Sequence, residues 1–195
     1  MARKHHRTTA PGDLYFLPAG PDEQLSHAQA LHQRAEADPA ARAQLLAEAA
    51  EYYAAAGRHG QADQLFRDAI ADGGHVAGSV HGFYAEFLFT HGRDTEALEA
   101  IDQARRTRPT DPDVFMVIGE TLDDHHRHAE AAKWLTTGLV RYYGDLASIT
   151  ADHLDDYDGA LLATARRRAR ANADLPEDHL DELARQHLDE DDEES

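Results

Sequence analysis

Apolar residues recur three and four positions apart along most of this chain, the spacing that places them on one face of an α-helix. Gly and Pro stand between these stretches, and no run alternates apolar and polar residues as a half-buried strand would. The pattern predicts an all-helical protein. The expected helices cover the ranges 22–37, 40–56, 60–72, 77–91, 94–107, 112–124, 128–142, 146–155, 157–172 and 176–188.

Three stretches of this pattern repeat with a period of almost 34 residues. Ala62, Ala97 and Ala131 stand 35 and 34 positions apart, and the same order of small and large residues surrounds each of them. A small residue at a helix crossing lets two helices approach closely, and a large residue fills the neighbouring groove. Such a period is typical of a solenoid of stacked helix pairs, a scaffold that presents a binding surface.

Each repeat unit is expected to bury one face of its first helix and one face of its second. On the first helices these residues are Leu46, Ala49, Ala50 and Tyr53, then His81, Tyr84, Ala85 and Leu88, then Phe115, Ile118, Gly119 and Leu122. On the second helices they are Ala62, Phe66, Ala69 and Ile70, then Ala97, Ile101, Ala104 and Arg105, then Ala131, Leu135, Gly138 and Leu139.

The repeat resembles the tetratricopeptide repeat family over residues 43–145. The resemblance rests on small residues such as Gly119, Ala69 and Ala104 and on large ones such as Tyr53 and Phe66 at the family's positions. The sequence departs from the family where His81 takes the place of a large residue and where Gly138 replaces the usual Ala. The resemblance implies a right-handed α–α superhelix of about three to four helix pairs followed by C-terminal capping helices.

The chain is expected to divide into four parts. These are a flexible N-terminal arm at 1–20, the repeat array at 21–145, a degenerate repeat with capping helices at 146–188, and a disordered acidic tail at 189–195. The repeat register slips after residue 145, because Ala160 follows Ala131 by only 29 positions. The stretch 166–183 also weakly resembles a segment of some bacterial SEC-C motif proteins, but it lacks the cysteine zinc knuckle that defines the motif.

The resemblance also implies a concave wall lined by the first helices, and its expected residues are mostly acidic. They are Glu51, Glu86, Phe89, Asp113, Met116, Glu120, Asp123 and Asp124. Each unit has Glu at the same repeat position, and stacked carboxylates repel one another. This predicts a protein partner that supplies a basic peptide or helix. The alternative is that Glu is simply a common, helix-favouring surface residue.

The charge of the chain narrows the choice of partners. Nineteen Lys and Arg face 37 Asp and Glu, which gives a formal charge of −18 and opposes binding to nucleic acid or anionic membranes. The chain has no Cys, which excludes disulfides and thiolate metal sites. No apolar run is long enough for a signal peptide or a membrane span, so we expect a cytoplasmic protein.

Two further clusters of side chains are candidates for a metal site or a nucleic-acid site. His125, His126 and His128 are weak candidates for metal ligands, but they straddle an expected turn between helices, where solvated histidines are the simpler interpretation. The basic run Arg166, Arg167, Arg168 and Arg170 suits ion pairs within the chain, opposite the acidic tail, better than nucleic-acid binding.

No catalytic motif is recognisable, so we expect neither an enzyme nor a cofactor. The favoured hypothesis is a protein-interaction scaffold with an acidic groove. A self-associating structural module, a homodimer through end faces near Tyr142, Tyr143 and Leu146, is the alternative. The third hypothesis is a regulator that binds nucleic acid or metal.

Overall fold

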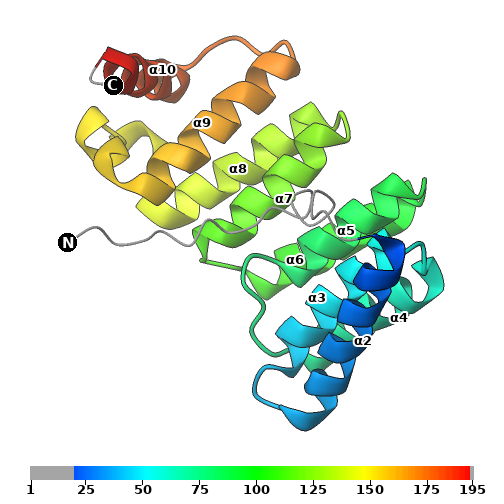
Figure 1. Cartoon of the computed structure of the whole chain (residues 1–195). Coiled ribbons are helices and arrows are strands. Elements are labelled where there is room, and N and C mark those ends of the chain that lie inside the picture. The colour runs from blue at the N-terminus through cyan, green and yellow to red at the C-terminus, as the bar shows by residue number, and fades with distance from the viewer. Residues whose placement is uncertain (1–19, 194–195) are drawn as a thin grey trace. The chain divides into compact units, whose positions relative to one another are not determined.

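The computed structural model describes residues 20–193, and these residues form α-helices, short 3₁₀ segments and loops, without a strand among them (Figure 1). The all-helical prediction is therefore confirmed. The chain forms two compact units that meet inside helix α6 (Asp94–Thr107), one up to Ile101 and the other from Asp102 onwards. Each unit is described by itself below. The predicted N-terminal arm lies outside the described residues, except for Gly20.

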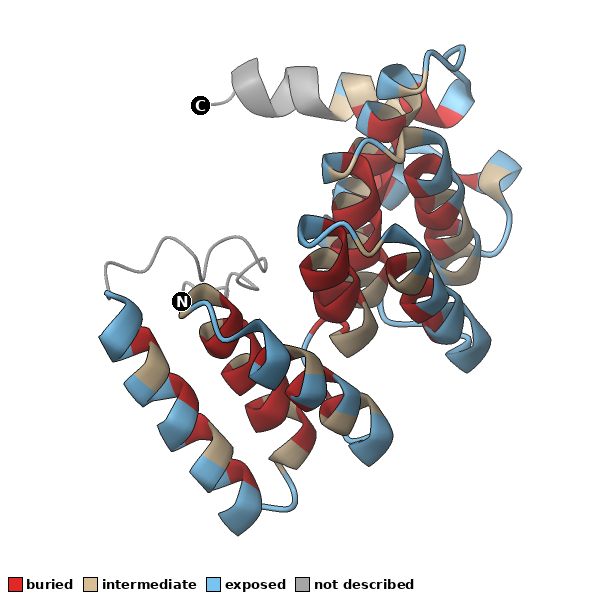
Figure 2. Ribbon diagram, turned by 90° about the vertical axis from the view of Figure 1, so that its right-hand side faces the viewer, coloured by how far each residue is buried: buried red, intermediate tan, exposed pale blue. Residues whose placement is uncertain are grey.

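The first unit contains four helices and the beginning of α6. They are α2 (Pro21–Ala37), α3 (Arg42–Ala55), α4 (His59–Asp72) and α5 (Val80–Thr90). Helix α3 packs against α2, α4 and α5, and α4 also contacts α5. On α2 and α4 the buried residues form a stripe and exposed residues occupy the opposite side, which is the amphipathic pattern that the spacing of apolar residues predicts (Figure 2). Helices α3 and α5 are buried on most of their surface, and Thr90 is the one exposed residue in these two helices.

The second unit contains the end of α6 and four further helices. They are α7 (Pro112–Asp124), α8 (His128–Tyr143), α9 (Tyr157–Asn172) and α10 (His179–Glu193). Helix α9 packs against α7, α8 and α10. Two 3₁₀ segments, η1 (Leu146–Ser148) and η2 (Ala151–Asp155), connect α8 to α9.

The ends of most predicted helices agree with the structure within three residues, but one C-terminal prediction was wrong. The expected helix at 146–155 is instead the pair η1 and η2, because Asp145 and Thr150 each cap a new short segment. Helix α10 extends to Glu193, five residues beyond the expected helix end at 188. Once its first turns are packed, each further residue of a helix adds one backbone hydrogen bond, which favours extension.

The turn between the two helices of a repeat unit has the same backbone geometry three times. Gly57, Gly92 and His126 adopt left-handed φ values of 70°, 69° and 60°. The residue after each donates its N–H to the carbonyl five positions earlier, at 2.8, 2.9 and 2.8 Å. These bonds form the helix-ending motif in which a left-handed residue satisfies the last carbonyls. The turn of the third repeat has His126 where the other two turns have Gly. A left-handed conformation costs His conformational energy that Gly does not lose.

Small residues hold the paired helices in close contact. Ala62, Ala97 and Ala131 are completely buried. In the second unit the contact between α7 and α8 is reciprocal. A Cβ added to Gly119 would lie 2.5 Å from Leu135 Cδ2, and one added to Gly138 would lie 2.7 Å from Phe115 Cγ. The large residue of each helix therefore occupies the space that the glycine of the other leaves empty.

The predicted buried faces are confirmed except at three positions. Ile70 is half-buried, and Arg105 is exposed, with its guanidinium group 5.7 Å from the centre of the Trp134 ring. His81 is also half-buried, and its Nδ1 has no hydrogen-bond partner. Burial lowers the pKa of His81, so the ring packs as a neutral group in place of a larger apolar residue.

The contact at Gly138 can be tested with the substitution Gly138→Ala. The new methyl group would push against the rigid ring of Phe115, and overpacking of this kind costs about 1–3 kcal/mol. Better helix propensity offsets about 1 kcal/mol of that cost. We expect a lower urea midpoint, monitored by helical circular dichroism.

Gly60→Ala is the matched control, because no atom lies within 4 Å of a Cβ at this helical position. Its urea midpoint should stay the same or rise slightly. Equal midpoints for the two variants would show that the glycine does not set the distance between α7 and α8.

Candidate functional site

The predicted wall residues are divided between the two compact units. Glu51, Glu86 and Phe89 lie in the first unit on α3 and α5. The other five lie on α7 in the second unit: Asp113, Met116, Glu120, Asp123 and Asp124. Their environments differ, and the differences decide what each carboxylate can bind.

Glu51 is a buried acid whose carboxylate is not satisfied by the protein. Only 7% of the residue is exposed, and its Oε1 has no hydrogen-bond partner. Burial, and secondly the charge of Glu48 one turn earlier, raise the pKa of Glu51 to about 8. An uncompensated buried charge is costly, so at neutral pH this carboxyl group holds a proton unless a cation replaces it.

The two wall residues of α5 are less unusual. Glu86 is half-buried, and its Oε1 accepts a hydrogen bond from Thr90 Oγ1 at 3.2 Å. Phe89 is buried, with 7% of the residue exposed. This part of the predicted wall therefore combines a carboxylate with a largely covered aromatic ring.

In the second unit, helix α9 already supplies basic and polar groups to the acids of α7. Arg168 Nε donates to Asp123 Oδ2 at 3.0 Å, and Asn172 Nδ2 lies 3.3 Å from both carboxylate oxygens. His128 Nδ1 lies 2.6 Å from Asp123 Oδ1. Arg168 also lies 3.8 Å from Glu120. The acidic side of α7 is thus a surface that a helix carrying Arg can cover.

These contacts explain the pKa of Asp123. Burial alone would raise it, because only 5% of the side chain is exposed. The hydrogen bonds from His128, Asn172 and Arg168 outweigh burial and lower the pKa below its ordinary value. Asp123 is therefore the charged counterpart of Glu51: both carboxylates are buried, and only Asp123 has donors.

The remaining wall residues of α7 are more exposed. Met116 is half-buried and Asp124 is exposed. Asp113 is half-buried, and its pKa is raised by burial and by the neighbouring charges of Asp111 and Asp158. The N-terminal ends of α7 and α9 thus bring several carboxylates together.

The histidine turn does not form a cluster of metal ligands. Among the described residues, no group of three or more His, Cys, Asp or Glu side chains is placed to hold a metal ion. His128 contacts Asp123, His126 is exposed, and His125 is half-buried. His126 also provides the left-handed residue of its turn, which gives it a structural role.

The basic run of α9 forms ion pairs with acids of the second unit, as predicted, and the side chains of the tail lie outside the described residues. Arg166 is buried, with 3% of its side chain exposed, and pairs with Asp178 and with Asp181 at 2.6 Å. Arg170 Nε donates to Asp181 at 2.7 Å. Hydrogen bonds from Arg166 and from the N–H of Asp181 hold the pKa of Asp178 at about 2, although burial acts in the opposite direction. We call these four residues the α9–α10 clasp.

One feature of the sequence points to the clasp. Arg166 falls on the stripe of Leu162, Ala165 and Ala169 in α9, so an amphipathic helix would bury it. A buried guanidinium group requires carboxylates or other acceptors nearby.

The predicted end face of α8 is partly satisfied within the chain. The Tyr142 hydroxyl donates to Asp156 at 2.8 Å, and the Tyr143 hydroxyl donates to the His153 carbonyl at 2.6 Å. Leu146 is half-buried. Exposed apolar side chains in this unit include Tyr157, with 67% of the residue exposed.

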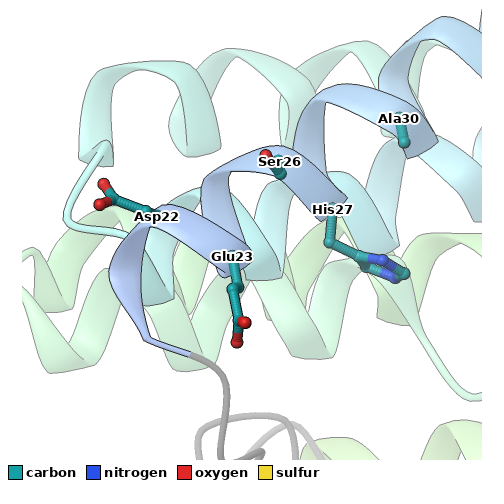
Figure 3. Close-up of a pocket in the computed structure, with 5 residues that line it drawn as sticks. All are labelled: Asp22, Glu23, Ser26, His27 and Ala30. Carbon is teal, nitrogen blue, oxygen red and sulfur yellow. The ribbon is translucent and has the colours of Figure 1, made fainter.

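Sequence reasoning missed an acidic surface formed by α2 and α3. A shallow depression of about 470 Å³ lies on one side of α2, lined by Asp22, Glu23, Ser26, His27 and Ala30 (Figure 3). The His27 ring meets the Tyr52 ring of α3, with centroids 4.4 Å apart. On α3, Glu48 and Glu51 stand four and one positions before Tyr52, on the same helical face. We call this surface the α2–α3 acidic face: it consists of the exposed Asp22, Glu23 and His27 on α2 and the half-buried Glu48 and Tyr52 on α3. Glu48 accepts a hydrogen bond from Gln44 Nε2 at 2.8 Å.

The chain was compared with protein-family models, with curated proteins and with solved structures, and none of them matches. No helix among the described residues combines the length and the apolar character that crossing a bilayer requires.

The protonation of Glu51 predicts how stability depends on pH. Its carboxyl group ionises near pH 4.5 without burial and near pH 8 in the folded chain, so between these values the folded state holds the extra proton. Stability from this group therefore falls as the pH rises through that window. Glu51→Gln should remove this dependence and should be the more stable protein at pH 9, by on the order of a few kcal/mol.

Urea midpoints of the wild type and Glu51→Gln between pH 5 and 9 provide the measurement. The control is Glu99→Gln, the same substitution at an exposed residue. If Glu51→Gln keeps the pH dependence of the wild type, the carboxyl group is not buried in solution.

The α9–α10 clasp predicts a large effect of Asp181→Asn. This change weakens the acceptor of both Arg166 and Arg170, and breaking a buried ion pair costs about 3–5 kcal/mol. We expect faster hydrogen exchange at residues 180–187 and a lower melting temperature. The control Asp152→Asn alters an exposed residue of η2 and should change neither. Unchanged exchange in Asp181→Asn would contradict the role of the clasp.

Proposed function

We propose that this chain is a scaffold of tetratricopeptide-like helix pairs that binds a basic peptide or helix of a protein partner. The three turns with the same backbone geometry and the three fully buried alanines support the repeat. The proposal includes the right-handed superhelix that this family adopts. The cysteine-free sequence fits a reducing compartment, and we propose the cytoplasm as the location of the protein.

The contact between α9 and α7 carries the proposal about the ligand. Arg168 and Asn172 approach Asp123 from a helix, and Arg168 also approaches Glu120, at one of the three repeated Glu positions. The contact is an internal example of the proposed recognition, because a basic helix covers the acidic side of a first helix. Charge-assisted hydrogen bonds of this kind are stronger than neutral ones.

The first unit offers an equivalent acid without such a donor. Glu51 occupies the repeat position of Glu120, and its Oε1 has no hydrogen-bond partner. A Lys or Arg from a partner would satisfy this atom and let the carboxyl group ionise. We therefore propose that the binding surface centres on Glu51 and Glu86, while α9 covers the corresponding acids of α7.

A labelled peptide with the sequence of residues 157–172, the basic helix α9, provides a probe for this proposal. Fluorescence anisotropy should show that it binds the full chain and that added salt weakens binding. Glu51→Gln combined with Glu86→Gln should raise the Kd at least about tenfold, a loss of about 1.4 kcal/mol. Adding Glu120→Gln should change little further, because Arg168 of the protein lies beside that residue.

The control is the triple change Glu99→Gln, Glu130→Gln and Glu182→Gln, which removes three charges at exposed positions elsewhere. This variant should bind the probe nearly as well as the wild type. If the control variant loses as much affinity for the probe as the variant Glu51→Gln with Glu86→Gln, the interaction depends on net charge alone. If the wild type does not bind the probe, the proposed function is rejected. Dimerisation detected by light scattering, without binding of the probe, would favour the self-associating module.

A further inference from the structure

Two histidines of the first compact unit meet at the surface where α4 begins and α5 ends. His59 is the first residue of α4, and His91 directly follows the last residue of α5. Both residues are exposed, and His59 Nδ1 lies 2.9 Å from His91 Nε2. Helices α4 and α5 are consecutive in the chain and pack against each other. The pair therefore bridges two neighbouring helices at a place that solvent can reach.

The hydrogen bonds of His91 determine which of its nitrogens carries a lone pair. Its Nδ1 lies 2.6 Å from the carbonyl oxygen of Phe87, and a carbonyl can only accept, so Nδ1 donates. In the neutral ring Nε2 then has no proton and accepts a hydrogen bond from His59 Nδ1. Histidines that bind metals in proteins almost always donate their other ring N–H to a carbonyl or a carboxylate. His91 already has this arrangement.

The surroundings of the pair restrict its motion and leave it without a competing cation from Arg93. The ring of Phe87, a buried residue, lies 4.4 Å from the His91 ring and 6.4 Å from the His59 ring, centroid to centroid. Arg93 follows His91 by two residues, but its guanidinium group donates to Asp63 at 2.7 Å and to Glu96 at 2.8 Å. These carboxylates compensate the charge that would otherwise oppose a bound cation.

The distances between the two rings suit a shared metal ion. Metal–imidazole bonds of about 2.0–2.1 Å place two adjacent nitrogen ligands about 2.8–3.4 Å apart, for angles of about 90–109° at the metal. At the smaller angle the ring centroids would lie about 4.5 Å apart, whereas a straight N–H···N bond would place them about 5.2 Å apart. The observed distances are 2.9 Å between the nitrogens and 4.3 Å between the centroids. Both are close to those of two rings bound side by side to one ion.

We propose that His59 Nδ1 and His91 Nε2 bind one divalent transition-metal ion, with copper(II) preferred. Imidazole suits copper, nickel and zinc, affinity among these ions is highest for copper(II), and square-planar coordination, with its right angles, is typical of copper(II) and nickel(II). In the described part of the chain no group of three or more His, Asp or Glu is placed to hold a metal, so water supplies the other ligands. The proton of His59 Nδ1 moves through the solvent to Nε2 of the same ring, and both rings stay neutral. The proposal is independent of the basic partner, because it involves neither Glu51 nor Glu86.

Paramagnetic broadening by copper(II) tests this site in the full chain. With substoichiometric copper(II) at about pH 7.5, where an ordinary imidazole is mostly neutral, the amide signals of residues 58–60 and 90–92 should lose most of their intensity. His59→Gln and His91→Gln each remove one ligand and should each restore these signals. A group that only orients a metal ligand is worth about 10–100-fold in affinity, so loss of a ligand should raise the Kd of this site at least about tenfold.

The matched control is His75→Gln, which removes an exposed imidazole of the same unit between α4 and α5. This variant should keep the broadening of the wild type. The chain contains fourteen His, so copper(II) can also bind elsewhere, and broadening confined to other residues would overturn the proposal. Equal broadening of residues 58–60 and 90–92 in all variants would overturn it as well.

Thermal unfolding provides a second readout that requires no assigned spectrum. An ion that binds the folded chain more tightly than the unfolded chain stabilises it, and this ion would link α4 to α5. One equivalent of copper(II) should therefore raise the melting temperature of the wild type and of His75→Gln by a few degrees more than that of His59→Gln or His91→Gln. The same rise in all four proteins would contradict a site at this pair.

Discussion

Close contact between small residues on one helix and large residues on the next is the constraint on which the rest of this structure depends. At Gly119 and Gly138 no additional carbon atom fits, because Leu135 and Phe115 fill the space. Protein interiors are packed as densely as organic crystals, so such a contact fixes the distance and the rotation of two helices together. Those two quantities decide which side of each helix is left for other contacts. The acids of α7 that Arg168 reaches are on the side that remains.

Much of the fold was predictable because its causes are local. The spacing of apolar residues fixes the buried side of a helix, and Gly57 and Gly92 mark ends that need a left-handed residue. The third turn was harder to recognise, since His126 performs the same role without the usual sequence sign. The connection at 146–155 was mistaken for a helix. There Asp145 and Thr150 bond to the backbone close by and end each segment after a few residues.

The candidate site was predictable only as a set of positions. The repeat register identified Glu51, Glu86 and Glu120 as equivalent, but equivalence in register does not determine environment. Whether a carboxylate at such a position is charged depends on which donor arrives from elsewhere in the chain. Arg168 lies 45 residues after Asp123, and no local pattern connects them. The α2–α3 acidic face was missed for a similar reason, since the contact between His27 and Tyr52 joins helices whose sequences show no common motif.

The buried carboxyl group of Glu51 ties the proposed binding of a basic partner to the pH of the solution. If a cation binds Oε1 as proposed, it replaces the proton held there near neutral pH, and binding then releases that proton into the solvent. Acidification then opposes any cationic occupant without a change in its concentration. The affinity for a cation at this position consequently depends on the pH of the solution as well as on the two binding surfaces.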